Sequence, residues 1–366
     1  MADRVVKMKN PVERLSEMLI KGDSQKAALV FSERNRRYLT EFNATDGALI
    51  VTADKAYLLM DFRYSEAAGY EAKNAEVVEF SSLSDKVKEI LKKHGITSVY
   101  LETEALSYAQ AGRFEKMFAE IGAEPVLNTE LDDTLRALRI IKSPHEVAKI
   151  EAAQAITDAA FQYILPKIKE GAAERELALD LEFFMRKEGA EAVAFDLIVV
   201  AGKNGSQCHG VPSSNTVQKG DFITIDMGAK LDGYHSDMTR TVACGAVSDE
   251  QKAVYDTVLK AHLAAAEAVK PGLKCSSIDK VARDIIETPY PGTFGHGLGH
   301  GVGFEIHEWP RFSRLDDTII EPGMVITDEP GIYIPGRFGV RIEDMLLVTE
   351  DGCRSLTKSP KELIIL

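Results

Sequence analysis

The first part of the chain alternates short apolar runs with longer amphipathic stretches. Apolar runs at residues 27–31, 48–52, 56–60 and 98–101 are typical of buried strands. In the stretches 83–94 and 108–121, apolar residues recur at helical spacing. This alternation predicts an α/β domain.

A second domain is predicted to begin within Asn128–Ser143. The run Ser143-Pro144-His145-Glu146 has the pattern of a capping box with proline at the first helical position, which marks a helix start. We place the two domains at residues 1–132 and 133–366.

The predicted second domain repeats one order of elements. Helical stretches at 143–170 and 174–189 precede strand-like residues 194–200 and 222–244. Helices at 248–270, opened by another capping box, and at 277–287 then precede strands from Gly299 onward. Two rounds of helix, helix and strands predict a pseudo-symmetric α+β domain.

Composition narrows the class of protein. A chain of 366 residues exceeds one hydrophobic core, and 45% hydrophobic with 28% charged residues is typical of a soluble fold. The net charge of −13 argues against nucleic acid as a partner. Because the first fifteen residues are charged throughout and no apolar stretch could span a membrane, we expect a cytoplasmic protein with no membrane partner.

The four cysteines give no sign of a disulfide framework or a thiolate zinc site, because they are far apart and form no Cys-x-x-Cys pair. Cys208 precedes His209, but neighbours on a strand point to opposite faces. A bystander thiol is therefore favoured over a Cys-His nucleophile.

Two aspartates lie in a predicted hairpin. Residues 222–227 alternate apolar and polar side chains as a half-buried strand does, and the chain turns near Asp232-Gly233. A turn centred between residues 231 and 232 sets Asp226 opposite Asp237. Opposed carboxylates on a buried sheet face are destabilising unless a cation lies between them, and divalent metal ions are the usual answer. The alternative is two aspartates on a solvated face.

A second hairpin aligns two glutamates. A turn centred at Gly336 sets Glu329 opposite Glu343. Because two independent hairpins each align two carboxylates, the alternative that these carboxylates lie on a solvated face is disfavoured.

Three histidines lie between these hairpins in a glycine-rich run. His296 and His300 have the spacing of helical zinc ligands, but Gly-Leu-Gly between them is a poor helix. His300 and His307 are seven residues apart and would face opposite sides of a regular strand, unless one reaches around a glycine bend. We expect one ligand and one catalytic group.

Four carboxylates and one histidine form an oxygen-rich set that suits two divalent ions. Manganese or cobalt fits best, and zinc or iron stays possible. A water that bridges two such ions becomes hydroxide near neutral pH, so the predicted chemistry is hydrolysis of a polarised carbonyl or phosphoryl group.

These motifs, in this order and over nearly the whole chain, resemble the pita-bread metallopeptidases, in the branch of aminopeptidase P and prolidase. The segments are IDMGAKLDGYHSDMTRT, HGLGHGVG, EPGIY and RIED. The resemblance implies a pita-bread catalytic domain after a smaller creatinase-like N-terminal domain. It also implies metal-dependent hydrolysis between an N-terminal residue and proline, with Xaa-Pro dipeptides or peptides with proline at the second position as substrates.

The same resemblance implies the metal ligands. Asp237 and Glu343 would bridge both ions, Asp226 would hold one ion, and His300 and Glu329 would hold the other.

It further implies roles around them. Glu329 would also shuttle the proton of the attacking water, and His307 would donate a hydrogen bond to the scissile carbonyl. His209 would line the substrate pocket and His296 would support it. Arg341 would steady the ligand set or a substrate carboxylate.

The N-terminal domain adds to the resemblance, because Asn35-Arg-Arg-Tyr38-Leu-Thr and Asp61-Phe-Arg63-Tyr64 resemble the non-catalytic domain of Xaa-Pro peptidases. Methionine aminopeptidases usually lack this domain. Relatives use this domain in dimers, so a homodimer is expected. Arg63 is either a pocket residue of the partner subunit or part of a surface salt bridge. One departure is Asp328, where relatives carry an apolar residue. Strand alternation predicts that Asp328 makes a polar contact behind the sheet, whereas an irregular strand would let it perturb the site.

Two other classes of protein are possible interpretations of this fold. A metal-independent creatine-type hydrolase and a non-enzymatic binding module share the fold, but both lack the five ligands that this chain retains. The sequence leaves open whether the enzyme is a dipeptidase or an aminopeptidase that acts on longer chains.

Overall fold

The computed structural model describes residues 9–366, so the first eight residues, on which the expectation of a cytoplasmic protein partly rests, lie outside the described residues. Contacts divide the chain into two compact units, one ending at Arg139 and one spanning Ile140–Leu366. Among the described residues, no helix is long and apolar enough to cross a membrane.

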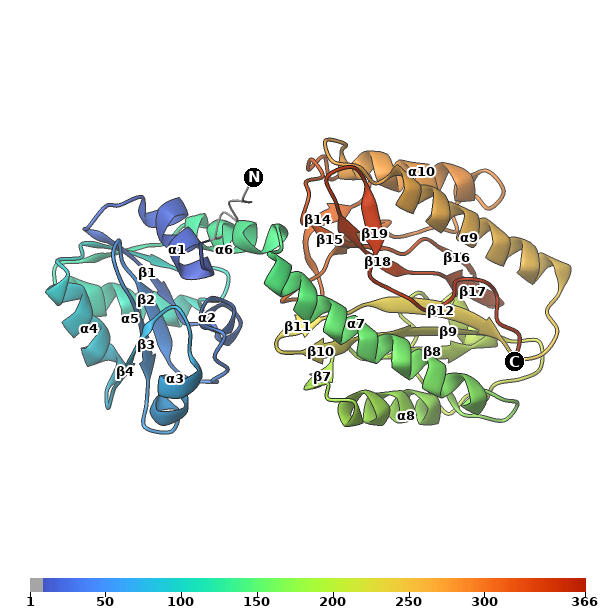
Figure 1. The fold of residues 1–366 in the computed structure, drawn as a ribbon, viewed down its shortest axis with the longest axis horizontal. Coiled ribbons are helices and arrows are strands. Elements are labelled where there is room, and N and C mark those ends of the chain that lie inside the picture. The colour runs from blue at the N-terminus through green and yellow to red at the C-terminus, as the bar shows by residue number, and fades with distance from the viewer. Residues whose placement is uncertain (1–8) are drawn as a thin grey trace, which may run out of the picture. The chain divides into compact units, whose positions relative to one another are not determined.

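The first unit is a mixed six-stranded sheet with helices (Figure 1). Its strands run in the order β4-β3-β2-β1-β5-β6. They are β1 Lys26–Val30, β2 Ala48–Val51, β3 Ala56–Met60, β4 Glu76–Glu79, β5 Ser98–Leu101 and β6 Glu124–Val126. The helices are α1 Pro11–Leu15, which continues as a π-helix over Ser16–Ile20, α2 Glu33–Thr40, α3 Ser65–Glu71, α4 Leu83–Lys93, α5 Tyr108–Ala119 and α6 Glu130–Ile140. These elements confirm the α/β prediction.

The second unit begins with a helix pair and the strands that follow it. The helices are α7 Pro144–Ile164, with a 3-10 turn at Leu165–Lys167, and α8 Glu174–Lys187. The strands are β7 Ala192–Val193, β8 Ile198–Ala201, β9 Phe222–Met227, β10 Ala229–Leu231, β11 Tyr234–His235 and β12 Met238–Ala243. A 3-10 helix, Gly202–Ser206, follows β8. Ser143 and Glu146 form the predicted capping box of α7.

A second helix pair and its strands repeat that order. The helices are α9 Asp249–Ala268 and α10 Cys275–Glu287. The strands are β13 Gly299–Gly301, β14 Glu308–Phe312, β15 Val325–Asp328, β16 Gly331–Ile334, β17 Phe338–Arg341, β18 Asp344–Val348 and β19 Cys353–Ser355. Five of these strands form a sheet in the order β14-β13-β15-β18-β19, and β16 pairs with β17.

Two hydrophobic cores follow this repeat. Residues of α7 and α8 pack with β8, β9 and β12, whereas residues of α9 and α10 pack with β15, β17 and β18. In Figure 1, α9 and α10 lie together on one side of the strands and α8 lies on the other. The predicted pseudo-symmetric α+β domain is confirmed.

The register of the first hairpin corrects the sequence-based prediction. Asp232 and Gly233 both have positive φ, 50° and 84°, and so occupy the two central positions of the turn. The turn centre therefore lies one residue later than predicted, and Asp226 pairs with Thr239. Asp226 and Asp237 are not directly opposed, and Asp237 precedes β12 outside the ladder.

The register of the second hairpin is as predicted. Gly331 pairs with Arg341 in the β16–β17 ladder, and Asp328 pairs with Asp344 in the β15–β18 ladder. Both pairs are symmetric about Gly336. Glu329 and Glu343 lie between these two ladders, on adjacent segments.

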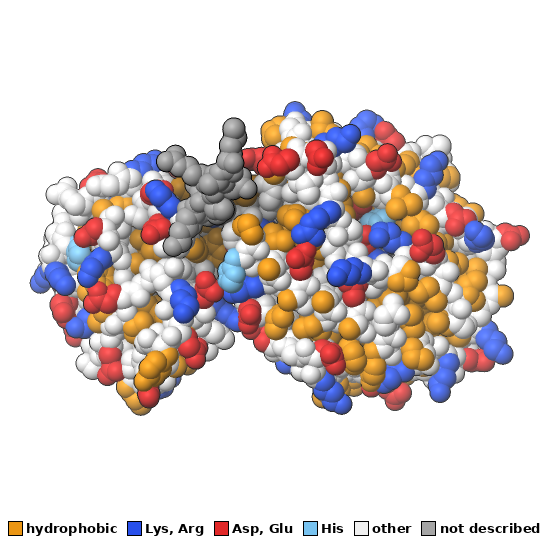
Figure 2. All heavy atoms as spheres, in the orientation of Figure 1, with side chains coloured by type: hydrophobic (Ala, Val, Ile, Leu, Met, Phe, Trp, Pro, Cys, Tyr) orange, Lys and Arg blue, Asp and Glu red, His pale blue; other side chains and the backbone are white. Residues whose placement is uncertain are grey.

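Basic and acidic side chains are interspersed on the described part of the surface that Figure 2 shows, and no basic stripe crosses that face of either unit.

Candidate metal centre

A cavity of about 560 Å³ lies in the second unit, and every side chain that the sequence singled out for chemistry lines it. These side chains are Asp226, Asp237, His300, Glu329, Glu343, His209, His296, His307 and Arg341. The fold thus gathers residues that are up to 134 positions apart in the chain, from His209 to Glu343.

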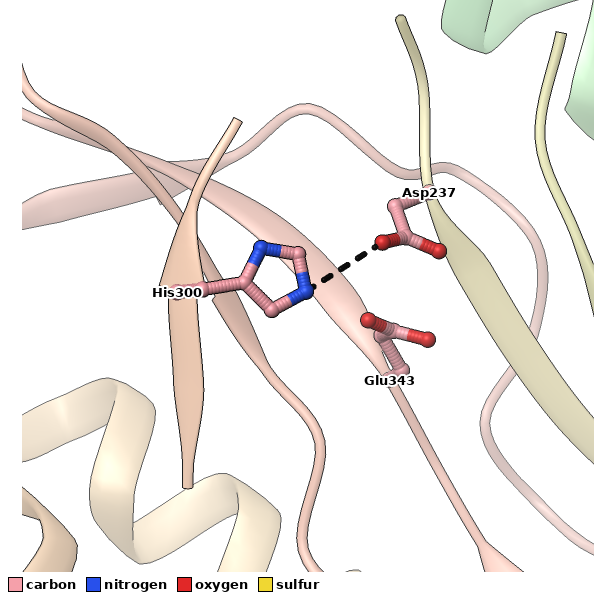
Figure 3. A group of neighbouring side chains, drawn as sticks. All are labelled: Asp237, His300 and Glu343. Carbon is pink, nitrogen blue, oxygen red and sulfur yellow. Dashed lines mark ion pairs between the residues drawn. The ribbon is translucent and has the colours of Figure 1, made fainter. Parts of the chain in front are cut away.

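Three of the side chains form a tight cluster at the wall of this cavity. Asp237, His300 and Glu343 each offer one ligand atom, and these atoms lie within 4.8 Å of one another. Figure 3 shows the three side chains pointing toward a common point, from the start of β12, from β13 and from the segment before β18. His300 Nε2 lies 3.6 Å from Asp237 Oδ2 and 3.4 Å from Glu329 Oε1.

Glycines allow the strand that carries His300 to approach its neighbours. A Cβ at Gly299 would collide with the backbone of Thr327 on β15. The ladder between β13 and β14 is irregular after His300, and the chain loops out before β14. His307 returns at the end of that loop, with its ring centroid 4.4 Å from that of His300. The glycine bend that the sequence left open brings both histidines to one site.

Asp226 is held by Arg341. Arg341 Nη2 lies 2.5 Å from Asp226 Oδ2, and the guanidinium is almost fully buried. The other carboxylate oxygen, Asp226 Oδ1, is buried and has no hydrogen-bond partner among residues 9–366. Buried acceptors normally have a partner, and a bound cation would satisfy this oxygen. The unpaired oxygen in a cavity lined by carboxylates therefore fits a cation-binding site.

The buried carboxylates of the cavity favour the binding of a cation. Burial raises the pKa of Asp237 and Glu343 well above their ordinary values, and neighbouring carboxylates add to the rise. Burial likewise raises the pKa of Glu329 to about 8, which Arg341 opposes. Burial and His307 lower the pKa of His300 to about 3, so His300 is neutral and free to be a metal ligand. This donor set fits divalent cations.

Two threonines that sequence reasoning missed orient the glutamates. Thr239 Oγ1 donates to Glu343 Oε2 at 2.6 Å and accepts from Arg341 Nε at 3.0 Å. Thr327 Oγ1 donates to Glu329 Oε1 at 3.2 Å and accepts from the His300 backbone N–H at 3.0 Å. Each lies two residues from a predicted ligand that adjoins the end of its strand, and this spacing of two is the signal that could have found it.

Tyr333 was also missed. Its hydroxyl accepts from Arg341 Nη1 at 2.8 Å and lies 3.1 Å from His296 Nε2. His296 Nδ1 donates to the Gly297 carbonyl at 2.8 Å, and burial lowers the pKa of His296 to about 4. His296 therefore reaches Arg341 through Tyr333.

The remaining predicted residues line the cavity and are open to solvent. His209 and His307 are both exposed, as befits groups that would meet a substrate. Cys208 lines the same cavity, and burial raises the pKa of its thiol, which favours the bystander interpretation. All four cysteines are free.

Arg63 and Asp328 have partners of their own. Arg63 forms ion pairs with Asp46 at 2.8 Å and Asp61 at 2.6 Å within the first unit, in line with the surface alternative. Asp328 contacts buried His262 on α9, which is the polar contact expected behind the sheet.

Comparisons with known proteins agree with this geometry. Residues 148–350 match the model of metallopeptidase family M24, and residues 13–141 match the creatinase/prolidase N-terminal domain.

Similar proteins cover nearly the full chain. An Xaa-Pro dipeptidase of Pyrococcus furiosus is 42% identical over 87% of this chain and 89% of its own length. A solved Xaa-Pro dipeptidase from Bacillus anthracis matches with a TM-score of 0.91 at 41% identity and covers 97% of this chain and 99% of its own. A solved X-Pro aminopeptidase from Thermotoga maritima matches with a TM-score of 0.89 at 35% identity, covering 96% of this chain and 99% of its own.

Proposed function

The chain belongs to metallopeptidase family M24, and on that premise we propose that it hydrolyses the peptide bond between an N-terminal residue and proline. The observation that carries this proposal is the convergence of all five predicted ligands on one cavity, which the exposed side chains of His307 and His209 also line. Relatives named for Xaa-Pro dipeptidase and X-Pro aminopeptidase activity support the substrate class.

We propose that the cavity holds two divalent ions, with manganese preferred. Asp237 and Glu343 would bridge them, since each has two oxygens and Glu343 sits at the cluster with His300. Asp226 would hold one ion through its unpartnered oxygen, and His300 with Glu329 would hold the other. When bound, such ions polarise a carbonyl and lower the pKa of a water molecule.

The protein groups would do the remaining work. Glu329 would accept the proton of the attacking water and pass it on, because burial places its pKa at about 8, near neutrality. His307 would donate a hydrogen bond to the scissile carbonyl from its exposed position beside His300. His209 would line the pocket for the substrate, while His296 and Arg341 would hold the ligand set in place through Tyr333 and Asp226.

A positively charged side chain in the cavity, Arg311, favours dipeptide substrates over longer peptides. Arg311 on β14 pairs with His300 in the ladder, lines the cavity and contributes positive potential at His307. Its guanidinium would match the free carboxylate of an Xaa-Pro dipeptide, which a longer peptide lacks at that position.

A homodimer and a cytoplasmic location stay predictions. Light scattering after size-exclusion chromatography checks the homodimer.

The test is product analysis by mass spectrometry after incubating manganese-loaded protein with Ala-Pro and, separately, with Ala-Pro-Ala. We expect release of proline from Ala-Pro and slower or no cleavage of the tripeptide. Glu343→Gln should abolish cleavage, whereas Glu250→Gln, a surface carboxylate paired with Arg337, should leave it unchanged. Cleavage of neither peptide by the wild type would refute the substrate class, and equal activity of Glu343→Gln would refute the site.

A further inference from the structure

The sheet behind the candidate metal centre carries a second pair of opposed acids. Asp328 on β15 pairs directly with Asp344 on β18, and each is 1% exposed. They adjoin Glu329 and Glu343 in the chain, so this part of the sheet presents carboxylates in front and behind. Directly opposed like charges on a buried face are destabilising without a cation.

His262 of α9 fills that role behind the sheet. Its side chain is fully buried, with Nδ1 3.1 Å from Asp328 Oδ2 and Nε2 3.4 Å from Asp344 Oδ2. Nδ1 also lies 3.1 Å from the Asp328 backbone carbonyl, to which it donates. Through this hydrogen bond, α9 holds the backbone immediately before Glu329 in place.

Asp328 depends on His262 more than Asp344 does. Asp344 also pairs with Arg240 and Lys361, each at 2.7 Å. Both carboxylate oxygens of Asp328 are buried and have no hydrogen-bond partner, so the ion pair with His262 is the compensation that the described residues give them.

The balance of charges favours an imidazolium. Burial opposes protonation of His262, but Asp328 and Asp344 outweigh burial and raise its pKa to about 9. Burial would raise the pKa of Asp344 too, yet His262 and Arg240 lower it. Burial raises the pKa of Asp328, and His262 opposes that rise.

We propose that His262 is a positioning residue for the metal centre, a fixed cation behind the sheet that sets the spacing of β15 and β18 and thereby of Glu329 and Glu343. The inference rests on the proposed metal site. Backbone contacts connect His262 and Asp344 to the two glutamates. His262 donates to the Asp328 carbonyl, and Arg240, whose Nη2 pairs with Asp344 Oδ1, donates from Nη1 to the Glu343 carbonyl at 2.5 Å. These contacts fix the backbone next to Glu329 and at Glu343, and thereby the positions of the two glutamate side chains.

A purely structural role for His262 makes a different prediction, which a pair of variants separates. His262→Leu alone leaves Asp328 as an unpaired buried charge and is expected to lower stability. His262→Leu/Asp328→Leu removes both charges, and replacing a buried ion pair by apolar groups is often neutral for stability. The double variant therefore keeps the fold while it deletes the bridge. Val258→Ala, a fully buried change on the same helix, is the control for loss of packing alone.

The experiment measures Mn²⁺ affinity by titration calorimetry, the visible spectrum of the Co²⁺-loaded protein, and the melting temperature without metal. We expect the double variant to melt near the wild type, to bind Mn²⁺ about 10- to 100-fold more weakly, and to show a changed Co²⁺ spectrum. Val258→Ala should melt lower but keep the wild-type affinity and spectrum. Wild-type affinity and spectrum in the double variant would overturn the inference. If the wild type itself binds no Mn²⁺, the proposed metal site fails, and the inference fails with it.

Discussion

Thr239→Val is expected to weaken metal binding without disturbing the fold. Valine matches threonine in shape but lacks the hydroxyl that donates to Glu343 Oε2 at 2.6 Å and accepts from Arg341 Nε at 3.0 Å. A hydrogen bond to a charged group contributes about 1.5 to 3 kcal/mol. At about 1.4 kcal/mol for each tenfold change in affinity, its loss corresponds to about a 10- to 100-fold weaker affinity for Mn²⁺.

The assay is calorimetric titration of Mn²⁺ into wild type, Thr239→Val and a matched control. Thr224→Val is suitable because Thr224 is buried on the neighbouring strand and its hydroxyl contacts Thr241 at 3.3 Å rather than a predicted ligand. The control should bind Mn²⁺ as the wild type does. Equal affinity of Thr239→Val and the wild type would refute the reasoning that this hydroxyl orients Glu343.

Three other predictions concern charge. Without metal, the free energy of unfolding should fall as pH rises from about 4.5 through about 8, because the pKa of Glu329 is raised in the folded protein and its protonated form favours folding; added Mn²⁺ should reverse the fall in thermal melts. Arg341→Leu should destabilise the metal-free protein by about 3 to 5 kcal/mol in urea titrations, since it leaves the largely buried Asp226 without its cation, while Arg337→Leu on the exposed part of the same hairpin should change little. The stability difference between wild type and His262→Gln should be on the order of 3 kcal/mol below pH 6.5 and should vanish as pH rises through about 9. The reason is that the pKa of His262 is raised in the folded protein, so His262 stabilises the fold only while it is protonated. A pH-independent difference in urea titrations would contradict this.

The two hairpins show what the sequence could and could not predict. The centre at Gly336 was correct, and it placed Glu329 and Glu343 on adjacent segments. In the first hairpin, Asp232-Gly233 takes two positive φ angles, and this tight turn shifts the register so that Asp226 faces Thr239. The Asp-Gly pair was visible in the sequence, so the correct centre was available from turn chemistry.

Contacts that depend on tertiary packing could not be predicted in the same way. The nine predicted ligand and catalytic residues line one cavity, and strand alternation together with resemblance was enough to select them. Tyr333 and His262 reach their partners across elements, from β16 to His296 and from α9 to Asp328, and no local spacing signals such contacts. Asp328 was identified as a polar side chain behind the sheet, but its partner lies 66 residues away on another element.

The most direct test of the metal centre is anomalous diffraction at the manganese edge from crystals of the Mn²⁺-loaded protein. The account predicts two peaks in the cavity, about 3.5 to 4 Å apart, with Asp237 and Glu343 between them, Asp226 at one peak and His300 with Glu329 at the other. No peak in the cavity, or peaks held by other side chains, would contradict it.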